Sequence, residues 1–86
     1  MDTITEVRVD LSALKTLGGQ SFFAIVHAYL KARAVDGVAR VTNKEAAEIF
    51  GVTPRYITSA ITSLRQVGLI SHYEYDGRHR IIHLSN

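Results

Sequence analysis

Two helical patterns separated by a very short break constrain the fold of this chain most. Thr42 fits a helix N-cap, and Glu45 follows three residues later to form a capping box, reaching back to the cap N–H. Gly51 is expected to end this first helix with a positive φ angle. Thr53 and Pro54 then restart a helix, with a hydroxyl at the N-cap and proline at position N1. The turn between the two helices can therefore span only three or four residues.

The second helix carries one apolar stripe and is followed by a hairpin pattern. The stripe residues recur at helical spacing and are Ile57, Ala60, Ile61, Leu64 and Val67. Gly68 closes this helix, and Asp76-Gly77 is the turn signal of a hairpin between residues 69–75 and 78–84. The pattern is that of a helix-turn-helix followed by a β-hairpin.

The first forty residues predict an extension and a longer helix. In the extension, residues 1–18, Thr5, Val7, Val9 and Leu11 alternate with polar residues, as in a half-buried strand, and Ser12 can cap a short helical turn. Residues 20–35 form the first long helix, with a polar stripe of Gln20, His27 and Lys31. Its apolar arc, Phe22–Leu30, is wide, so this helix either lies centrally or faces another subunit. Val38–Val41 is a candidate strand.

Composition excludes several classes of protein. A chain of 86 residues forms one domain, and the absence of cysteine excludes a disulfide scaffold, a thiolate zinc finger and a cysteine nucleophile. The longest apolar run, Phe22–Val26, is too short to span a membrane, and the first residues do not fit a secretory signal. We therefore expect a cytoplasmic protein without a membrane partner.

The positive charge is concentrated in the second half of the chain. The net charge is +2, and residues 1–50 hold six basic and six acidic side chains, so the surplus lies in residues 51–86. Between Glu48 and Glu74 no carboxylate occurs, although Arg55 and Arg65 lie there. Such a segment can approach a polyanion without like-charge repulsion. A mildly basic face that serves only solubility is the alternative.

The residues of both helices and of the hairpin resemble the winged helix-turn-helix DNA-binding domains. The matching residues are Glu45-Ala46-Ala47, Gly51-Val52-Thr53, Ile57-Thr58-Ser59-Ala60-Ile61, Leu64, Gly68-Leu69-Ile70, Asp76-Gly77-Arg78 and Ile82-His83-Leu84-Ser85. Bacterial repressors of the multiple-antibiotic-resistance and cyclic-AMP-receptor types carry similar patterns. Val41-Thr42-Asn43-Lys44 is similar to N-terminal domains of phage and plasmid replication initiators. The chain departs from the family at Ser59, where arginine is frequent.

This resemblance implies a mainly α fold with a small antiparallel β-hairpin, the wing, on a three-helix core. The single domain 1–86 would hold the helix-turn-helix at 42–67 and the wing at 69–85. The implied function is sequence-specific binding of double-stranded DNA by a repressor-type transcriptional regulator, which would be nucleoid-associated. The alternatives are a plasmid or phage replication or partition factor and a protein–protein adaptor. The expected DNA-binding residues are Lys44, Thr53, Arg55, Tyr56, Thr58, Ser59, Thr62, Arg78 and Arg80. Arg78 and Arg80 have an alternative role in cation–π packing against Tyr73 and Tyr75.

A DNA-binding domain of this small size is expected to work as a homodimer that binds two half-sites of the DNA. The surplus apolar residues that predict the interface are Val7, Val9, Phe22, Phe23 and Val26. The alternative is that these residues cover the core of a monomer.

No catalytic or cofactor-binding pattern is found. The sequence lacks a nucleophile–base–orienter set and a glycine-rich phosphate loop, so we expect no enzyme, no cofactor and no small-molecule ligand. His72, His79 and His83 could share one face of the hairpin if its loop has two residues. Without cysteine partners these histidines are interpreted as ordinary strand residues, and no metal is expected.

Overall fold

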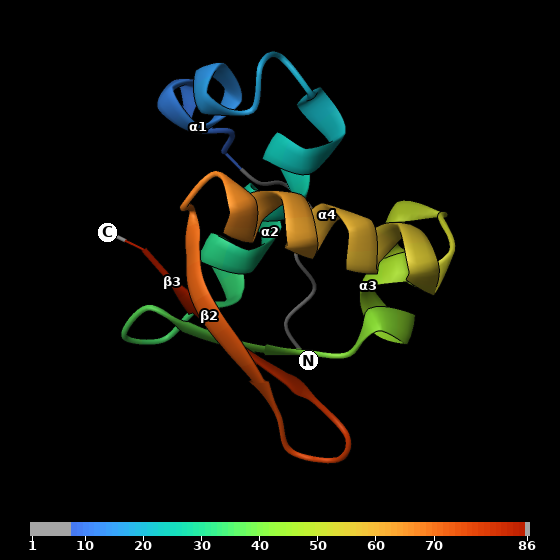
Figure 1. Ribbon diagram of the computed structural model, residues 1–86. Coiled ribbons are helices and arrows are strands. Elements are labelled where there is room, and N and C mark those ends of the chain that lie inside the picture. Colours follow the sequence, from blue (N-terminus) through green and yellow to red (C-terminus); the bar gives the residue numbers. More distant parts are fainter. Residues whose placement is uncertain (1–7, 86) are drawn as a thin grey trace.

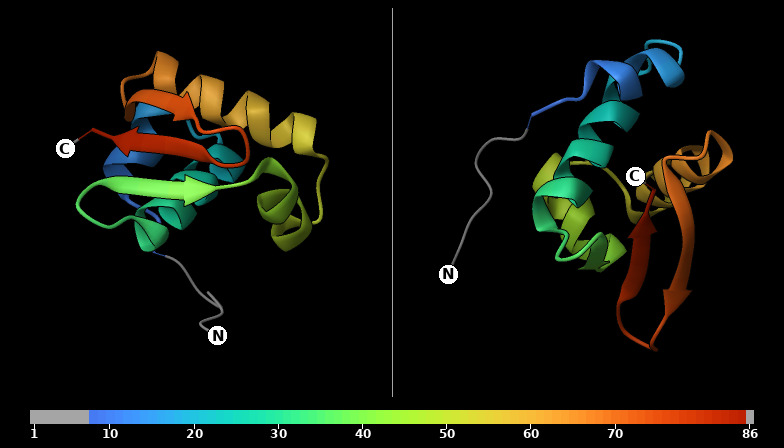
Figure 2. Two further views of the ribbon diagram at one scale, coloured as in Figure 1. Left: turned by 90° about the horizontal axis from the view of Figure 1, so that it is seen from below. Right: turned by 90° about the vertical axis from the view of Figure 1, so that its left-hand side faces the viewer.

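The structure, a computed structural model, describes residues 8–85 of the chain (Figure 1). Within that range it is a small α/β domain in which helices lie against one face of an antiparallel sheet (Figure 2). The helices are α1 (Leu11–Thr16), α2 (Ser21–Arg33), α3 (Asn43–Phe50) and α4 (Pro54–Gln66). The strands are β1 (Val38–Val41), β2 (Ile70–Tyr75) and β3 (Arg80–Leu84).

The sheet has the strand order β1-β3-β2, and both pairings are antiparallel. The predicted hairpin therefore carries a third strand, because β1 pairs with the free edge of β3. The main chain at the end of β3 is also held by the turn before β1, where the Leu84 N–H donates to the Gly37 carbonyl at 2.8 Å. This arrangement agrees with the expected helix-rich domain bearing a hairpin, and the strand expected at Val38–Val41 is confirmed.

The predicted start and stop signals of α3 and α4 are confirmed. The Thr42 hydroxyl accepts from the Glu45 N–H at 3.0 Å, and the Thr53 hydroxyl accepts from the Tyr56 N–H at 3.2 Å. Gly51 adopts a left-handed conformation with φ of 69°, which side chains with a Cβ rarely adopt. These signals fix both ends of the connection, so the two helices are joined by residues 51–53.

Only half of the predicted capping box forms. The carboxylate of Glu45 contacts the guanidinium of Arg33 and lies 3.4 Å from the Tyr29 hydroxyl. An arginine partner offers this carboxylate a charge-assisted hydrogen bond, which is stronger than a bond to the neutral cap N–H. Glu45 therefore joins α3 to α2, and the expected bond back to the Thr42 N–H is replaced.

The predicted N-terminal strand is wrong within the described residues. Residues 8–10 have no regular structure, and Leu11 begins α1 with 78% of its surface exposed; Thr5 and Val7 lie outside the described residues. The cap of α1 is also Asp10, whose carboxylate accepts from the Ser12 N–H at 2.9 Å, and not Ser12 itself. Asp10 can make this bond because a side-chain oxygen at the N-cap reaches the N–H two residues on.

Helix α2 lies centrally, which explains its wide apolar arc. It contacts α1, α4 and β1, and its buried residues include Val26 and Tyr29. The prediction that His27 lies on a polar stripe is wrong, since only 4% of its surface is exposed and its Nδ1 has no hydrogen-bond partner among residues 8–85. Burial lowers the pKa of His27, the positive Lys31 lowers it further, and Asp10 opposes both.

Candidate nucleic-acid interface

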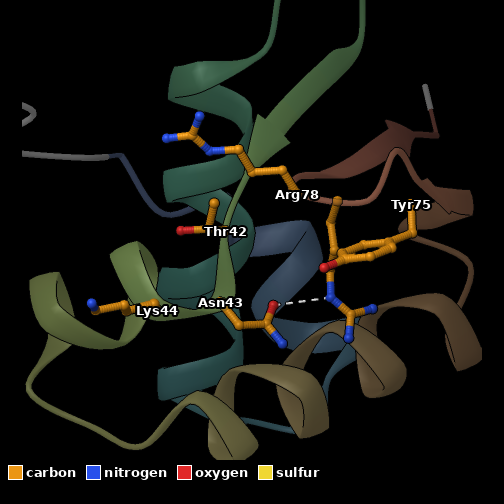
Figure 3. Close-up of a pocket in the computed structure, with 6 residues that line it drawn as sticks. Thr42, Asn43, Lys44, Tyr75 and Arg78 are labelled. Atoms are coloured by element: carbon orange, nitrogen blue, oxygen red, sulfur yellow. Dashed lines mark hydrogen bonds between the residues drawn. The ribbon is translucent and has the colours of Figure 1, made fainter.

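A groove of about 550 Å³ opens between the start of α3 and the tip of the β2–β3 hairpin (Figure 3). Its lining residues are Thr42, Asn43, Lys44, Tyr75, Arg78 and Arg80. Three of them are cationic and none is a carboxylate. Because basic side chains from two elements distant in sequence line it, the groove is suited to an anion.

Asn43 holds the two sides of this groove together. Its Oδ1 accepts from Arg80 Nε on β3 at 2.9 Å, the bond drawn as a dashed line in Figure 3. Its Nδ2 donates to the Thr58 hydroxyl on α4 at 2.8 Å. A single amide therefore links the first residue of α3 to both the hairpin and the second helix of the pair.

Arg80 is fixed within the protein rather than extended to solvent. Its guanidinium lies 5.0 Å from the centroid of the Tyr73 ring, within cation–π range, in addition to its bond to Asn43. The alternative role that the sequence suggested, packing against Tyr73, is therefore the one observed. Arg80 still lines the groove, so it contributes its charge from a fixed position.

The hairpin tip is a four-residue loop, residues 76–79, rather than a two-residue turn. One oxygen of Asp76 accepts from the backbone N–H groups of His79, at 2.6 Å, and Arg78, at 3.0 Å. The bond from the His79 N–H lowers the pKa of Asp76 most, and the bond from the Arg78 N–H lowers it as well. The nearby charges of His79 and Arg40 lower this pKa further. The Asp76 side chain thereby binds the His79 N–H, which in a two-residue turn would donate to the Asp76 carbonyl.

Arg78 leaves the tip with an exposed side chain. Its backbone N–H is bound by Asp76, but no ion pair of its guanidinium occurs within residues 8–85. The second oxygen of Asp76 instead lies 3.5 Å from Arg40. The guanidinium of Arg78 is therefore placed to meet an external anion.

Helix α4 adds an exposed polar face next to the groove. Its residues contain no carboxylate, and the side chains of Arg55, Ser59 and Thr62 are exposed, as predicted. Thr53 is also exposed, but its hydroxyl caps the helix. Lys44, beside Asn43, is exposed at the start of α3. The hydrogen bond between Asn43 and Thr58 places the start of α3 next to the first half of α4.

Two predicted contact residues have partners inside the protein. The Thr58 hydroxyl accepts from Asn43 and donates to the Pro54 carbonyl at 3.3 Å, so its hydrogen-bonding capacity is largely used. The ring of Tyr56 stacks on Phe22, with 44% of the residue exposed. The helical pattern alone placed both residues on the outer face, because it does not show which outer residues meet a neighbouring element.

The residues expected at a dimer interface are distributed differently. Val26 is 1% exposed and packs in the core, so a partner subunit cannot reach it. Phe22 and Phe23 are half-buried against that core, whereas Val9 remains exposed and Val7 lies outside the described residues. The wide apolar arc of α2 is thus covered largely by α1, α4 and the sheet.

Sequence reasoning did not place Thr42, Asn43 and Tyr75 at the groove. Asn43 and Arg80 are 37 residues apart, and no spacing rule links them. The one sequence signal for Asn43 was its position directly after a predicted N-cap, which placed it in the first turn of a helix. Its role depends on the strand pairing that brings β3 beside α3.

None of the helices within residues 8–85 is long and apolar enough to cross a membrane. Comparisons with models of protein families, with curated proteins and with solved structures find no match for this chain.

Proposed function

We propose that the protein binds double-stranded DNA sequence-specifically, as a transcriptional regulator that acts by occupying an operator. The observation that carries this proposal is the groove between α3 and the hairpin tip, with three cations and no carboxylate, beside the acid-free exposed face of α4. A basic surface formed by a helix pair and a hairpin offers DNA both phosphate contacts and side chains for base edges.

The order of the elements supports a winged helix-turn-helix. Helices α3 and α4 are followed directly by the β2–β3 hairpin, whose tip lies beside the start of α3. In a helix-turn-helix the second helix enters the major groove, its N-terminal residues contact base edges and the first helix crosses the backbone. Helix α4 would then be the recognition helix and the hairpin would be the wing.

The residues divide into two groups of contacts. Arg55, Lys44 and Arg78 are exposed cations and would bind phosphates, Arg55 and Lys44 next to helix N-termini that already favour anions. Ser59 and Thr62 have exposed hydroxyls on α4 and would contact base edges. Arg80 would support the wing through Tyr73 and Asn43 rather than contact DNA alone.

We also propose that two copies bind together, because a single domain of this size buries only about 600–1,000 Å² on DNA. Two copies would contact half-sites about 10–10.5 base pairs apart, or a multiple of that spacing. A replication or partition factor would use the same surface, and the position of the bound site, at a promoter or at an origin, distinguishes the two functions.

The test is fluorescence anisotropy with a labelled duplex of random sequence at several salt concentrations. Binding should weaken with a log–log slope of about −0.9 for each neutralised phosphate. Arg78→Ala and Arg55→Ala should each weaken binding and flatten that slope by about one. Lys15→Ala removes an equal charge from α1, at the end of the molecule away from the hairpin tip (Figure 1), and should leave the slope unchanged. No binding at low salt by the folded protein, or an equal effect of Lys15→Ala, would exclude this interface.

A further inference from the structure

The outer face of the β2–β3 hairpin brings together three side chains able to ligate a metal. One ring nitrogen each of His72 and His83 and a carboxylate oxygen of Glu74 lie within 4.8 Å of one another. Tyr73 and Ile82 are register partners whose side chains pack with the core, so the alternate residues His72, Glu74 and His83 point to the opposite face. That face carries no helix in the described chain (Figure 2) and is separate from the groove.

The two histidines are direct cross-strand partners. Their rings stack with centroids 4.0 Å apart and planes inclined by 14°. His83 Nε2 is already 3.0 Å from Glu74 Oε2. Two ligands of a tetrahedral Zn²⁺, each about 2.0–2.2 Å from the ion, are about 3.3 Å apart. Since His72 and Glu74 are exposed, side-chain rotation alone can bring the third ligand atom to that spacing.

A β-bulge prepares His72 for this role. Ile70 pairs with Leu84 and His72 with His83, so Ser71 is the extra residue on β2. The Ser71 hydroxyl donates its only hydrogen to the His83 carbonyl at 3.1 Å, and Ser71 Oγ lies 3.2 Å from His72 Nδ1. This contact requires Nδ1 of His72 to carry the hydrogen, an assignment made from the hydrogen-bond network. Nε2 of that ring then carries the lone pair that can bind a metal. A hydroxyl that accepts a hydrogen bond from the other ring nitrogen is a typical outer-shell partner of a histidine ligand.

We propose that His72, Glu74 and His83 form a binding site for a divalent transition-metal ion such as Zn²⁺, with water completing the coordination. Two imidazoles and one carboxylate favour Zn²⁺ and its neighbours over Mg²⁺ or Ca²⁺, which prefer all-oxygen sites. The ion would cross-link β2 to β3 and stabilise the folded hairpin by mass action. This site departs from the sequence-based expectation of no metal, and it is independent of the proposed DNA binding.

The test is calorimetric titration of Zn²⁺ into the chelator-treated full chain, together with the visible absorption of its Co²⁺ complex. We expect one ion per chain, a rise in melting temperature on Zn²⁺ addition, and Co²⁺ bands of low-symmetry coordination that Zn²⁺ abolishes. His72→Gln and His83→Gln should each weaken binding at least tenfold, and Glu74→Gln should weaken it less.

His79→Gln is the matched control, because His79 lies in the tip loop and is not part of the cluster. Circular dichroism of the metal-free variants checks that each remains folded. The proposal is overturned if the folded wild-type chain binds no Zn²⁺, or if His79→Gln weakens binding as much as His72→Gln does. A folded His72→Gln/His83→Gln double variant that binds like the wild type would also overturn it.

Discussion

The ring of Tyr56 lies almost parallel to the ring of Phe22, with centroids 4.7 Å apart and planes inclined by 10°. Tyr56 belongs to the first turn of α4 and Phe22 to the first turn of α2. Phe50, at the end of α3, meets the same Phe22 ring edge-on at 5.7 Å. This aromatic cluster fixes where α4 begins, and it therefore fixes the direction in which the exposed Arg55 and Ser59 point.

Replacing Phe22 by alanine should lower the free energy of unfolding by about 1–3 kcal/mol, since a half-buried ring and its aromatic pairs are lost. Urea denaturation followed by circular dichroism measures this change. Leu11→Ala is the matched control, because that side chain is 78% exposed and its loss should change stability by no more than about 0.5 kcal/mol. Equal effects of the two substitutions would contradict the role given to the cluster.

Asn43→Ala should lower the free energy of unfolding by about 1–2 kcal/mol, because two hydrogen bonds between elements are removed. The neighbouring Lys44→Ala, which removes an exposed side chain, should be nearly neutral in the same thermal or urea melts. In the Asn43 variant, NMR signals of the Arg80 Nε–H and the Thr58 region should shift. Wild-type stability and unshifted signals would show that Asn43 does not link the two sides of the groove.

The sequence predicted most accurately the elements with strong local signals. Thr42, Gly51 and Thr53-Pro54 act on N–H groups and φ angles within three residues, so the pattern alone located the ends of α3 and the start of α4. The apolar stripe of α4 was equally local in origin, and its residues are buried except Val67, which lies at the C-cap with 40% of its surface exposed. These signals do not depend on the rest of the fold.

Features that depend on distant partners were not predictable in the same way. His27 was assigned to a polar stripe because its spacing fits one, yet the packing of α2 in the centre of the domain buries it. The link between Asn43 and Arg80 exists only once β3 lies beside α3. The four-residue hairpin loop likewise depends on the particular bonds of Asp76, although Asp76-Gly77 marked its position correctly.

The stability of the protein should fall with acidification below the ordinary histidine pKa of about 6.5. Burial lowers the pKa of His27 in the folded state, so the unfolded chain takes up this proton first as the pH falls. The contribution of His27 to the free energy of unfolding is then lost between the unfolded and the folded pKa, by at most about 1.4 kcal/mol per pH unit.

His27→Leu removes the titrating group and the unpartnered Nδ1, and urea melts between pH 8 and 5 should show a flatter profile than the wild type. Between pH 8 and 7.5 the protonation of His27 should change the stability of either protein very little, so this pH range serves as the internal control. A variant whose stability declines as steeply as that of the wild type below pH 6.5 would assign the acid sensitivity to other groups.

The exposed hydroxyls of α4 should separate in their effects on DNA binding. If Ser59 and Thr62 contact base edges, Ser59→Ala and Thr62→Ala should each cost about 1–3 kcal/mol on the preferred duplex and much less on random DNA. Thr58→Ala should instead lower stability, because the Thr58 hydroxyl is bonded to Asn43 and Pro54. Competition binding and urea melts on the same three variants compare these effects, and a specificity loss confined to Thr58→Ala would reverse the assignment.

The last prediction concerns the proposed homodimer, for which the structure leaves a smaller surface than the sequence suggested. Val26 is buried and Phe22 and Phe23 are half-buried against the core, whereas Val9 and Leu11 remain exposed on either side of Asp10, which pairs with Lys31 near the other end of α2. Sedimentation equilibrium at micromolar concentration should give a mass near twice the 9.5 kDa of one chain. Val9→Glu places a charge on an exposed residue and should return the mass to that of the monomer without unfolding the domain, whereas Lys15→Glu, also on the surface, should leave the dimer intact. A monomer mass for the wild type, unchanged by a duplex carrying one half-site, would mean that each copy binds alone.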